Sequence, residues 1–135
     1  VMDLMQRAKE HPQGEHVLLR VEKSDRNTWK SRISVGRATN NDLILRHESV
    51  SKLHGHFQIR AGGGREELVL SDVGSANGTH VNGRGCGESL EEALPVNPGD
   101  RVLFGEVECR MLDAGGVYDK VSSQRVSATR EFTLN

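Results

Sequence analysis

Residues 71–83 have the sequence Ser-Asp-Val-Gly-Ser-Ala-Asn-Gly-Thr-His-Val-Asn-Gly, in which turn-forming residues separate two short strand patterns. The pair Asn77-Gly78 suits a tight turn, because both residue types tolerate a positive φ. One strand pattern, at residues 67–72, precedes this turn, and another, at residues 79–82, follows it. This order of strand, polar loop and strand predicts local β-structure.

The same pattern continues on both sides of this stretch. Apolar and polar residues alternate at positions 17–21 and 29–35, as they do in half-buried strands. Further strand patterns lie at residues 42–46, 55–61, 101–104 and 107–112. Turn-forming clusters separate them, such as Asn97-Pro98-Gly99-Asp100, which has Pro and Gly where a type II turn needs them. Many short strands predict an all-β, antiparallel sandwich or barrel.

The chain of 135 residues is long enough for one domain and a tail. We expect an N-terminal lead-in at residues 1–14, with a possible short helix at 3–10, and the domain itself at residues 15–113. From residue 114 the composition becomes rich in Ser, Thr, Arg and Gln, which predicts a C-terminal tail or linker over residues 114–135. The helix-leaning residues 88–93 are expected to form a loop.

The composition argues against several classes of protein. Eighteen Lys and Arg against nineteen Asp and Glu give a net charge of −1, too balanced to attract nucleic acid or anionic membranes by field strength alone. One Trp, one Tyr and three Phe residues are too few for a platform that stacks single-stranded bases. No apolar run is long enough for a membrane span. We therefore expect a cytoplasmic protein, with two reduced cysteines, that binds neither nucleic acid nor membranes.

Three loop segments hold polar residues that folding alone does not require. They are Gly36-Arg37, residues 49–54 (Ser-Val-Ser-Lys-Leu-His) and residues 74–79 (Gly-Ser-Ala-Asn-Gly-Thr). Together they offer a guanidinium group, hydroxyl and ammonium donors, and an amide that both donates and accepts. This set of groups suits an oxyanion that is attached to a peptide.

In their order and spacing, these segments resemble the forkhead-associated (FHA) domain. The resemblance lies in Gly36-Arg37, in Ser51-x-x-His54, and in Leu70-Ser71-Asp72 followed by Ser75-x-Asn77-Gly78-Thr79-x-Val81-Asn82-Gly83. It continues through residues 98–105 and spans roughly residues 18–112. One such motif would be weak evidence, but the ordered series is specific. The resemblance implies an FHA-like antiparallel β-sandwich of about eleven strands whose loops bind phosphothreonine in partner proteins.

The resemblance also implies a role for each residue of the site. Arg37 is expected to contact the phosphate or the adjacent peptide backbone, and Ser51 to donate its hydroxyl to a phosphate oxygen. Asn77 is expected to hydrogen-bond the main chain of the bound peptide. Lys52 stands where the family often has Arg or Asn, so it is expected to add a positive charge without a bidentate fork.

Three further residues are expected to support the loops. His54 corresponds to the family's structural histidine, and Gly36 and Gly78 are expected to allow a close approach or a positive φ. One departure is Ala76, because the family commonly has a Thr there whose hydroxyl helps to bind phosphate. A hydrogen bond to a charged group contributes about 1.5–3 kcal/mol, so the missing donor predicts an affinity weaker by about tenfold or more.

Simpler interpretations of these residues remain open. Arg37 could cover apolar surface with its aliphatic stem, and Ser51 could bond its own backbone in a turn. The Asn77-Gly78 pair has a turn role whether or not it also binds a ligand.

Two chemical interpretations are disfavoured by what the sequence lacks. A zinc site built on His47, His54 and His56 has no nearby fourth ligand. A hydrolase triad of Ser51, His54 and Asp72 lacks the Gly-x-Ser-x-Gly turn before a helix. We therefore expect no metal, no cofactor and no enzymatic activity.

The sequence predicts a phosphothreonine-dependent protein–protein interaction module in Ser/Thr kinase signalling. Its partner would be a protein or peptide that contains phosphothreonine, and a Ser/Thr protein kinase is implied. The alternative is an FHA-like scaffold with a degenerate phosphate site that mediates phospho-independent assembly. Ala76 keeps that alternative open.

Overall fold

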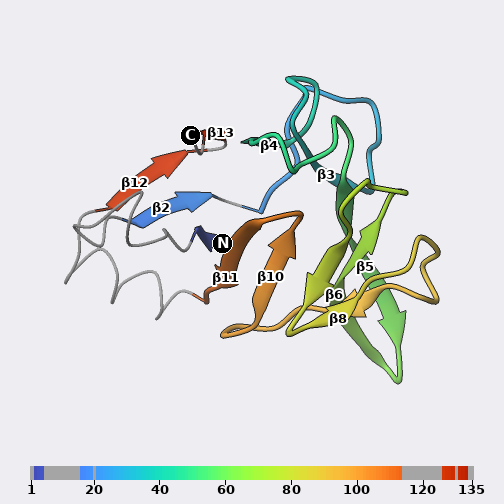
Figure 1. Cartoon of the computed structure of the whole chain (residues 1–135). Coiled ribbons are helices and arrows are strands. Elements are labelled where there is room, and N and C mark those ends of the chain that lie inside the picture. Colours follow the sequence, from blue (N-terminus) through green and yellow to red (C-terminus); the bar gives the residue numbers. More distant parts are fainter. Residues whose placement is uncertain (1, 5–15, 20, 114–125, 130, 134–135) are drawn as a thin grey trace.

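Two β-sheets face each other in the computed structural model, which describes residues 2–4, 16–19, 21–113, 126–129 and 131–133 (Figure 1). One sheet has seven strands and the other has six. The expected all-β sandwich is confirmed, with thirteen described strands where the resemblance implied about eleven. The described residues contain no helix.

The seven-stranded sheet has the order β12-β2-β1-β11-β10-β7-β8. Its strands, in chain order, are β1 (Met2–Leu4), β2 (His16–Leu19), β7 (Thr79–Val81), β8 (Arg84–Gly85), β10 (Arg101–Phe104), β11 (Val107–Met111) and β12 (Val126–Thr129). Its pairs are antiparallel except for β12 with β2. Asn82 (φ 50°) and Gly83 (φ 84°) form the two-residue turn between β7 and β8, so β7 ends one residue before the predicted strand does. Positive φ at both positions matches the right-handed twist of the paired strands.

The six-stranded sheet has the order β13-β4-β3-β5-β6-β9. Its strands are β3 (Ile33–Gly36), β4 (Leu43–Arg46), β5 (Gly55–Gly62), β6 (Arg65–Asp72), β9 (Leu94–Pro95) and β13 (Glu131–Thr133). β5 and β6 form a long antiparallel hairpin. β4 lies parallel to both β3 and β13, so the antiparallel pattern is not complete.

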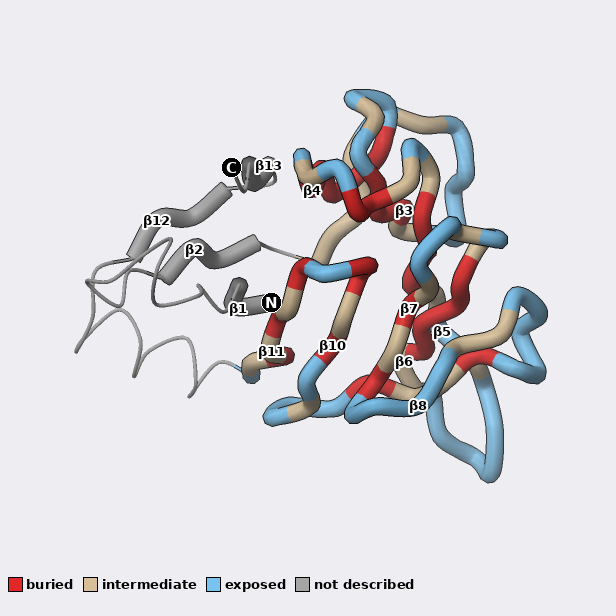
Figure 2. Tube along the Cα trace, viewed as in Figure 1, coloured by how far each residue is buried: buried red, intermediate tan, exposed pale blue. Residues whose placement is uncertain are grey.

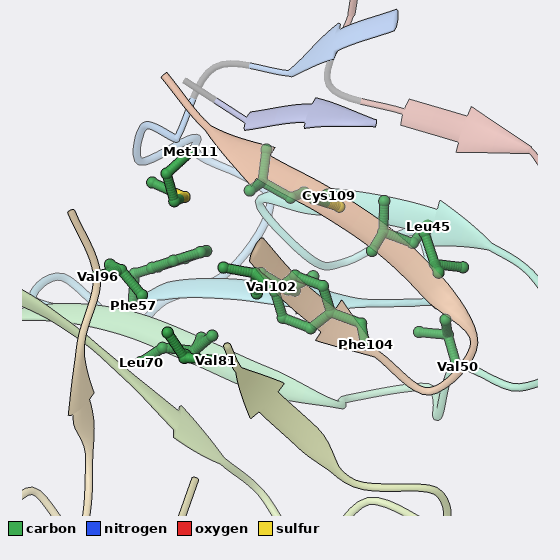
Figure 3. Packing of buried hydrophobic residues seen from close by; sticks show 13 residues of the cluster. Leu45, Val50, Phe57, Leu70, Val81, Val96, Val102, Phe104, Cys109 and Met111 are labelled. Atoms are coloured by element: carbon green, nitrogen blue, oxygen red, sulfur yellow. The ribbon is translucent and has the colours of Figure 1, made fainter. Parts of the chain in front are cut away.

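The core lies between the two sheets (Figure 3). Phe57 from β5 and Phe104 from β10 are fully buried, and their rings meet edge to face with centroids 6.3 Å apart. Residues two apart in a strand share one face of the sheet, so alternate residues of each strand point into the core. The cluster comprises Val35, Leu43, Leu45, Val50, Phe57, Leu70, Val81, Val96, Val102, Phe104, Val107, Cys109 and Met111. Since each large apolar side chain contributes about 1.5–3 kcal/mol when buried, this cluster is the main source of stability.

Two terminal segments differ from the sequence-based expectation. Met2–Leu4 is a strand that pairs with β2 and β11 on its two sides, not the start of a short helix. Such pairing satisfies the main chain, whereas an isolated helix of eight residues is marginal. The rest of the possible helix lies outside the described residues.

The predicted tail contributes strands β12 and β13, which lie parallel to β2 and β4. Parallel partners need long crossovers, so no local sequence pattern predicts them. The other residues of segment 114–135 lie outside the described part of the chain.

One internal detail differs from the expectation and another matches it. Trp29, which was predicted within a strand, lies before β3 and is 38% exposed. Residues 88–93 form turns, as expected of a loop. Among the described residues, no helix is long and apolar enough to cross a membrane.

Candidate functional site

Four hydrogen-bonded loops form one end of the sandwich, opposite the tip of the β5–β6 hairpin (Figure 1). They are the β3–β4 loop (37–42), the β4–β5 loop (47–54), the β6–β7 loop (73–78) and the β10–β11 turn (105–106). We call them the apical loops. The amide of Gly105 donates to the Gly78 carbonyl over 3.0 Å, and that of Val73 donates to the His54 carbonyl over 3.0 Å. Main-chain bonds thus join segments far apart in sequence into one surface.

Consecutive carbonyls of the β4–β5 loop orient two of the predicted binding residues. The Ser49 carbonyl accepts a hydrogen bond from Asn77 Nδ2 at 2.9 Å, and the Val50 carbonyl accepts one from Arg37 Nε at 3.0 Å. The Ser51 carbonyl accepts the main-chain N–H of Arg37 at 2.9 Å. The Arg37 side chain is exposed, and its Nη groups have no hydrogen-bond partner among the described residues. They are the donors that this guanidinium can offer to a ligand.

The next carbonyl, that of Lys52, holds the β3–β4 loop in place. It accepts the Ala38 amide at 3.1 Å and Asn41 Nδ2 at 2.7 Å. Gly36 lies directly against this carbonyl, because a Cβ at position 36 would overlap the Lys52 oxygen. The close approach that orients Arg37 therefore excludes any side chain at residue 36.

Ser51 and His54 are joined beneath the surface. His54 is fully buried; its Nδ1 accepts the Ser51 N–H at 3.0 Å, and its Nε2 lies 2.8 Å from the Gly78 carbonyl oxygen. Since a main-chain N–H can only donate, Nδ1 carries no proton and Nε2 donates, which makes the ring neutral. Burial lowers the pKa of His54, although the bond to Gly78 and the charge of Asp72 act in the opposite direction. Ser51 Oγ accepts the Ala76 N–H at 3.1 Å, so its own hydrogen can serve a ligand.

Asp72 fixes the β6–β7 loop from below. Its carboxylate accepts hydrogen bonds from the Ser75 amide at 3.0 Å, from the Ser75 hydroxyl, and from Thr79 Oγ1 at 2.7 Å. Ser75 Oγ in turn accepts the Gly78 amide at 2.9 Å, and Gly78 has a φ of 84°. Burial opposes ionisation, but the hydrogen bonds outweigh it and hold the pKa of Asp72 below its usual range. Because the Ser75 hydroxyl is used inside the loop, it does not replace the donor that is missing at Ala76.

The structure brings the predicted residues together at this end. Arg37, Lys52 and Asn77 are exposed and Ser51 is half-buried, and the apical loops mix exposed, intermediate and buried residues in Figure 2. His54 lies beneath them. The surface thus combines a guanidinium group, an ammonium group, a hydroxyl and an amide, which are groups that suit a phosphorylated peptide.

A metal-binding interpretation gains no support from the geometry. Both ring nitrogens of His54 are used in hydrogen bonds, and His47 Nδ1 accepts the Ser49 amide at 3.1 Å. The described part of the chain contains no group of three or more His, Cys, Asp or Glu residues that could hold a metal ion.

Two supporting residues were missed by the sequence analysis. Ser49 is buried; its carbonyl orients Asn77, and its hydroxyl accepts the Glu106 amide at 2.9 Å. Asp72 was named within the motif of the resemblance and in the disfavoured triad, but was given no supporting role. The spacing Asp72-x-x-Ser75 was the available signal, because an Asp side chain that bonds main-chain N–H groups downstream commonly orders a loop. Ser49 gave no signal of its supporting role, since its bonds to Asn77 and Glu106 span 28 and 57 residues.

Comparison with known proteins gives the same family. The family model described as "FHA domain" matches residues 33–105. The glycogen accumulation regulator GarA of Mycolicibacterium smegmatis is 37% identical over 73 residues, which are 54% of this chain and 40% of GarA. The chain therefore spans less than half the length of this curated relative.

Solved structures share the fold. The Slr1951 protein from Synechocystis sp. matches with a TM-score of 0.54 and 18% identity, over 83% of this chain and 95% of that one. The yeast Dun1 FHA domain, solved with a doubly phosphorylated peptide derived from Rad53, matches with a TM-score of 0.53 and 20% identity, over 81% and 70% of the two chains. The family match covers more than half of the chain and includes the apical loops up to residue 105, so this protein belongs to the FHA-domain family.

Proposed function

We propose that this domain binds phosphothreonine-containing segments of partner proteins and so acts as an interaction module in Ser/Thr kinase signalling. The observation that carries the proposal is the orientation of Arg37 and Asn77 by the carbonyls of Val50 and Ser49, beside the Ser51 hydroxyl. Donors held in place before binding lose little conformational entropy when a ligand arrives. Residues 15–113 form the binding module in this proposal, and the β12 and β13 segments are additions to its sheets.

Each group has a distinct task. A phosphate on threonine carries about −1.5 to −2 charges and three acceptor oxygens, which suit the Nη donors of Arg37, the hydroxyl of Ser51 and the ammonium group of Lys52. The Asn77 side chain donates through Nδ2 to Ser49, and its Oδ1 is then the acceptor for a main-chain N–H of the peptide. Phosphate supplies the charge-dependent part of affinity, and Asn77 fixes the direction of the chain.

The comparisons support this function by analogy. GarA is named a regulator, and the yeast Dun1 domain was solved with a phosphorylated peptide. In this proposal the domain recognises its ligand without catalysis or a cofactor. A Ser/Thr kinase produces the ligand, and the domain meets it in the cytoplasm.

One observation favours a second candidate, a scaffold that assembles with partners independently of phosphorylation. Ala76 is exposed beside Asn77 and offers only its main-chain N–H, which bonds Ser51 Oγ. A lost hydrogen bond to a charged group costs about 1.5–3 kcal/mol. The remaining donors of Arg37, Ser51 and Lys52 favour retained but weakened phosphate binding.

Titration of a phosphothreonine peptide library tests the proposal. The wild-type domain should bind phosphorylated peptides and bind their unphosphorylated counterparts hardly at all. Arg37→Ala should abolish measurable binding, whereas Arg37→Lys should retain part of it, since an ammonium group cannot form the planar fork. Arg84→Ala is the matched control, because Arg84 is exposed on β8 outside the apical loops.

The same titration separates the two candidates. Equal binding of phosphorylated and unphosphorylated peptides, with no effect of Arg37→Ala, would support the scaffold and refute the phosphate site. Matched phosphoserine peptides should bind about 10 to 200-fold more weakly if the family's preference for threonine applies, which is the range expected for one methyl group in an apolar pocket.

A further inference from the structure

Two loop segments cover the outer face of the six-stranded sheet. In β5, Phe57 points into the core, so His56 and Arg60 point to the opposite, outer face. The Trp29 ring meets the His56 ring there, with centroids 6.2 Å apart and an interplanar angle of 75°. Arg60 Nη1 donates to the Leu90 carbonyl at 3.0 Å. The segments that carry Trp29 and Leu90 therefore lie over the same face, on the right of Figure 1.

These two segments are exposed and carry opposite charges. Residues 28–32, Thr-Trp-Lys-Ser-Arg, and residues 88–92, Glu-Ser-Leu-Glu-Glu, are exposed at every position. The first has two basic residues and no acidic one, and the second has three acidic residues and no basic one. We call them the basic segment and the acidic segment. Each places one apolar side chain among its charges, since Trp29 is 38% exposed and Leu90 is 41% exposed.

The basic segment is held in a defined conformation. The Trp29 amide donates to Asn27 Oδ1 at 3.0 Å, and Asn27 Nδ2 donates to the buried carboxylate of Asp42 at 2.8 Å. The Trp29 ring has His56 at one side, and the Arg32 guanidinium carbon lies 5.3 Å from its centroid. Trp and Arg contribute most of the binding energy at many protein interfaces. The ring therefore offers a fixed apolar surface to a partner.

The acidic segment is also ordered, although it has no regular secondary structure. Ser89 Oγ accepts the Glu92 amide at 3.1 Å and donates to Glu92 Oε1 at 2.9 Å. The Gly87 amide donates to the Glu92 carbonyl at 3.1 Å, and Arg60 holds the Leu90 carbonyl. Leu90 thus projects from a fixed main chain, and such a side chain loses little conformational freedom when a partner binds it.

The positions of the two segments favour contact between chains rather than within one chain. They contact β5 at His56 and Arg60, four residues apart, which is a separation of about 13 Å. Exposed charges more than about 8 Å apart are largely screened at physiological ionic strength, so attraction between the segments of one chain is weak. A two-fold rotation about an axis midway between them brings the basic segment of each copy onto the acidic segment of the other. Each contact is then made twice, and the assembly closes as a dimer.

We propose that the outer face of the six-stranded sheet binds a second copy of this chain and forms a symmetric dimer. The dimer places Trp29 of each copy against Leu90 of the other. The charged residues that face one another across the interface are then Lys30, Arg32, Glu88 and Glu91. Neither segment includes a residue of the proposed phosphate site, so this inference goes beyond the proposed function and does not depend on it.

The test measures self-association by analytical ultracentrifugation over a range of protein concentrations. The wild-type chain should show a concentration-dependent monomer–dimer equilibrium. The variants Lys30→Glu/Arg32→Glu and Glu88→Lys/Glu91→Lys should each dimerise at least about tenfold more weakly, because like charges then face one another at both contacts. An equimolar mixture of these two variants should form a heterodimer with an affinity within about threefold of wild type, since both contacts again join opposite charges.

The mixture makes the test independent of folding defects, because only two folded variants can restore each other's association. Arg84→Glu/Arg101→Glu, a matched charge change on exposed residues of the seven-stranded sheet, should dimerise like wild type. A wild-type chain that stays monomeric at millimolar concentration, or a mixture that forms no heterodimer, would overturn the proposal. Growth of wild type beyond the dimer would overturn the two-fold arrangement. No phosphopeptide is present, so failure here leaves the proposed function intact.

Discussion

The two ends of the β5–β6 hairpin differ in whether their polar groups are buried and hydrogen-bonded or exposed to solvent. Where β5 begins and β6 ends, His54, Asp72 and Thr79 are buried and hydrogen-bonded. His54 bonds the Gly78 carbonyl, and the Thr79 hydroxyl donates to Asp72. At the opposite end, residues 61–66 are all exposed, and three successive glycines form the tip (Figure 2). Near that tip an ion pair joins Arg60 to Glu67 at 2.6 Å.

The difference follows from the cost of burying polar atoms. Water can satisfy the main chain of an exposed hairpin tip, whereas a buried donor or acceptor without a partner costs about 1–3 kcal/mol. The apical loops therefore need many specific bonds, and these bonds also fix the orientation of Arg37 and Asn77, the proposed ligand-binding groups. Rigidity is concentrated at the end where the proposed function needs it.

Removing Asp72 should have the largest effect. In Asp72→Ala the Ser75 amide, the Ser75 hydroxyl and the Thr79 hydroxyl lose their acceptor. At about 1–3 kcal/mol for each buried donor left unsatisfied, we expect a loss of about 3–5 kcal/mol in the free energy of unfolding. Urea denaturation measures it. Glu66→Ala, on the exposed part of β6, is the control and should change stability by less than about 0.5 kcal/mol; equal losses would contradict the contrast between the two ends.

The same substitution, glycine to alanine, tests this contrast at one position in each end of the molecule. Gly105 and Gly64 have φ values of 60° and 75°, so alanine costs about 1–2 kcal/mol of backbone strain at either position. A Cβ at Gly105 would also overlap the Ser49 carbonyl, whereas nothing lies within 4 Å of a Cβ at Gly64. Gly105→Ala should therefore lower the unfolding midpoint more, and weaken phosphopeptide binding through Ser49. Equal stability of the two variants would contradict the close packing of Gly105 against Ser49.

Ala76→Thr should strengthen phosphopeptide binding by about tenfold. The added hydroxyl lies beside Asn77 and supplies one more donor to the phosphate, worth about 1.5 kcal/mol or more. Calorimetric titration with one phosphothreonine peptide measures the change, and Ala76→Val, which is similar in size but has no hydroxyl, is the control. Unchanged affinity in Ala76→Thr would mean that Lys52 already serves that phosphate oxygen.

The smallest expected effect is a pH dependence of stability from His54. Because burial lowers its pKa, the folded domain binds fewer protons than the unfolded chain below the unperturbed pKa of about 6.5. The stabilisation by neutral His54 is complete above that pH and is lost as the pH falls through the folded pKa. Urea unfolding between pH 8 and 5 should show a shallower decline in His54→Gln than in wild type.

The lowered pKa values of His56 and Asp72 do not affect the comparison between wild type and His54→Gln. His56, whose pKa is also lowered by burial, contributes equally to both proteins. The lowered pKa of Asp72 affects stability only below its unperturbed value of about 3.9. If the free energy of unfolding declined equally with pH in wild type and His54→Gln, the His54 ring would not be held neutral.

Local pattern predicted the central strands well. The strand at residues 101–104 coincides with β10, and those at 55–61 and 107–112 match β5 and β11 within one residue. Alternation and turn residues act over a few positions, so they are visible in sequence. The two-residue strands β8 and β9, and the parallel strands β12 and β13, were missed because their partners, not their composition, make them strands.

The sequence by itself determined the class of fold, the order of the loops and the identity of the exposed groups Arg37, Lys52 and Asn77. Those features depend on residue type and spacing along the chain. Only the tertiary structure decided which atoms of Arg37 and Asn77 are used inside the domain, because carbonyls of the β4–β5 loop accept from Arg37 Nε and Asn77 Nδ2. It also placed Trp29 beside the apical loops rather than in a strand. Hydrogen bonds between residues 13 to 28 positions apart fix these orientations, and no local pattern in a sequence encodes such distant partners.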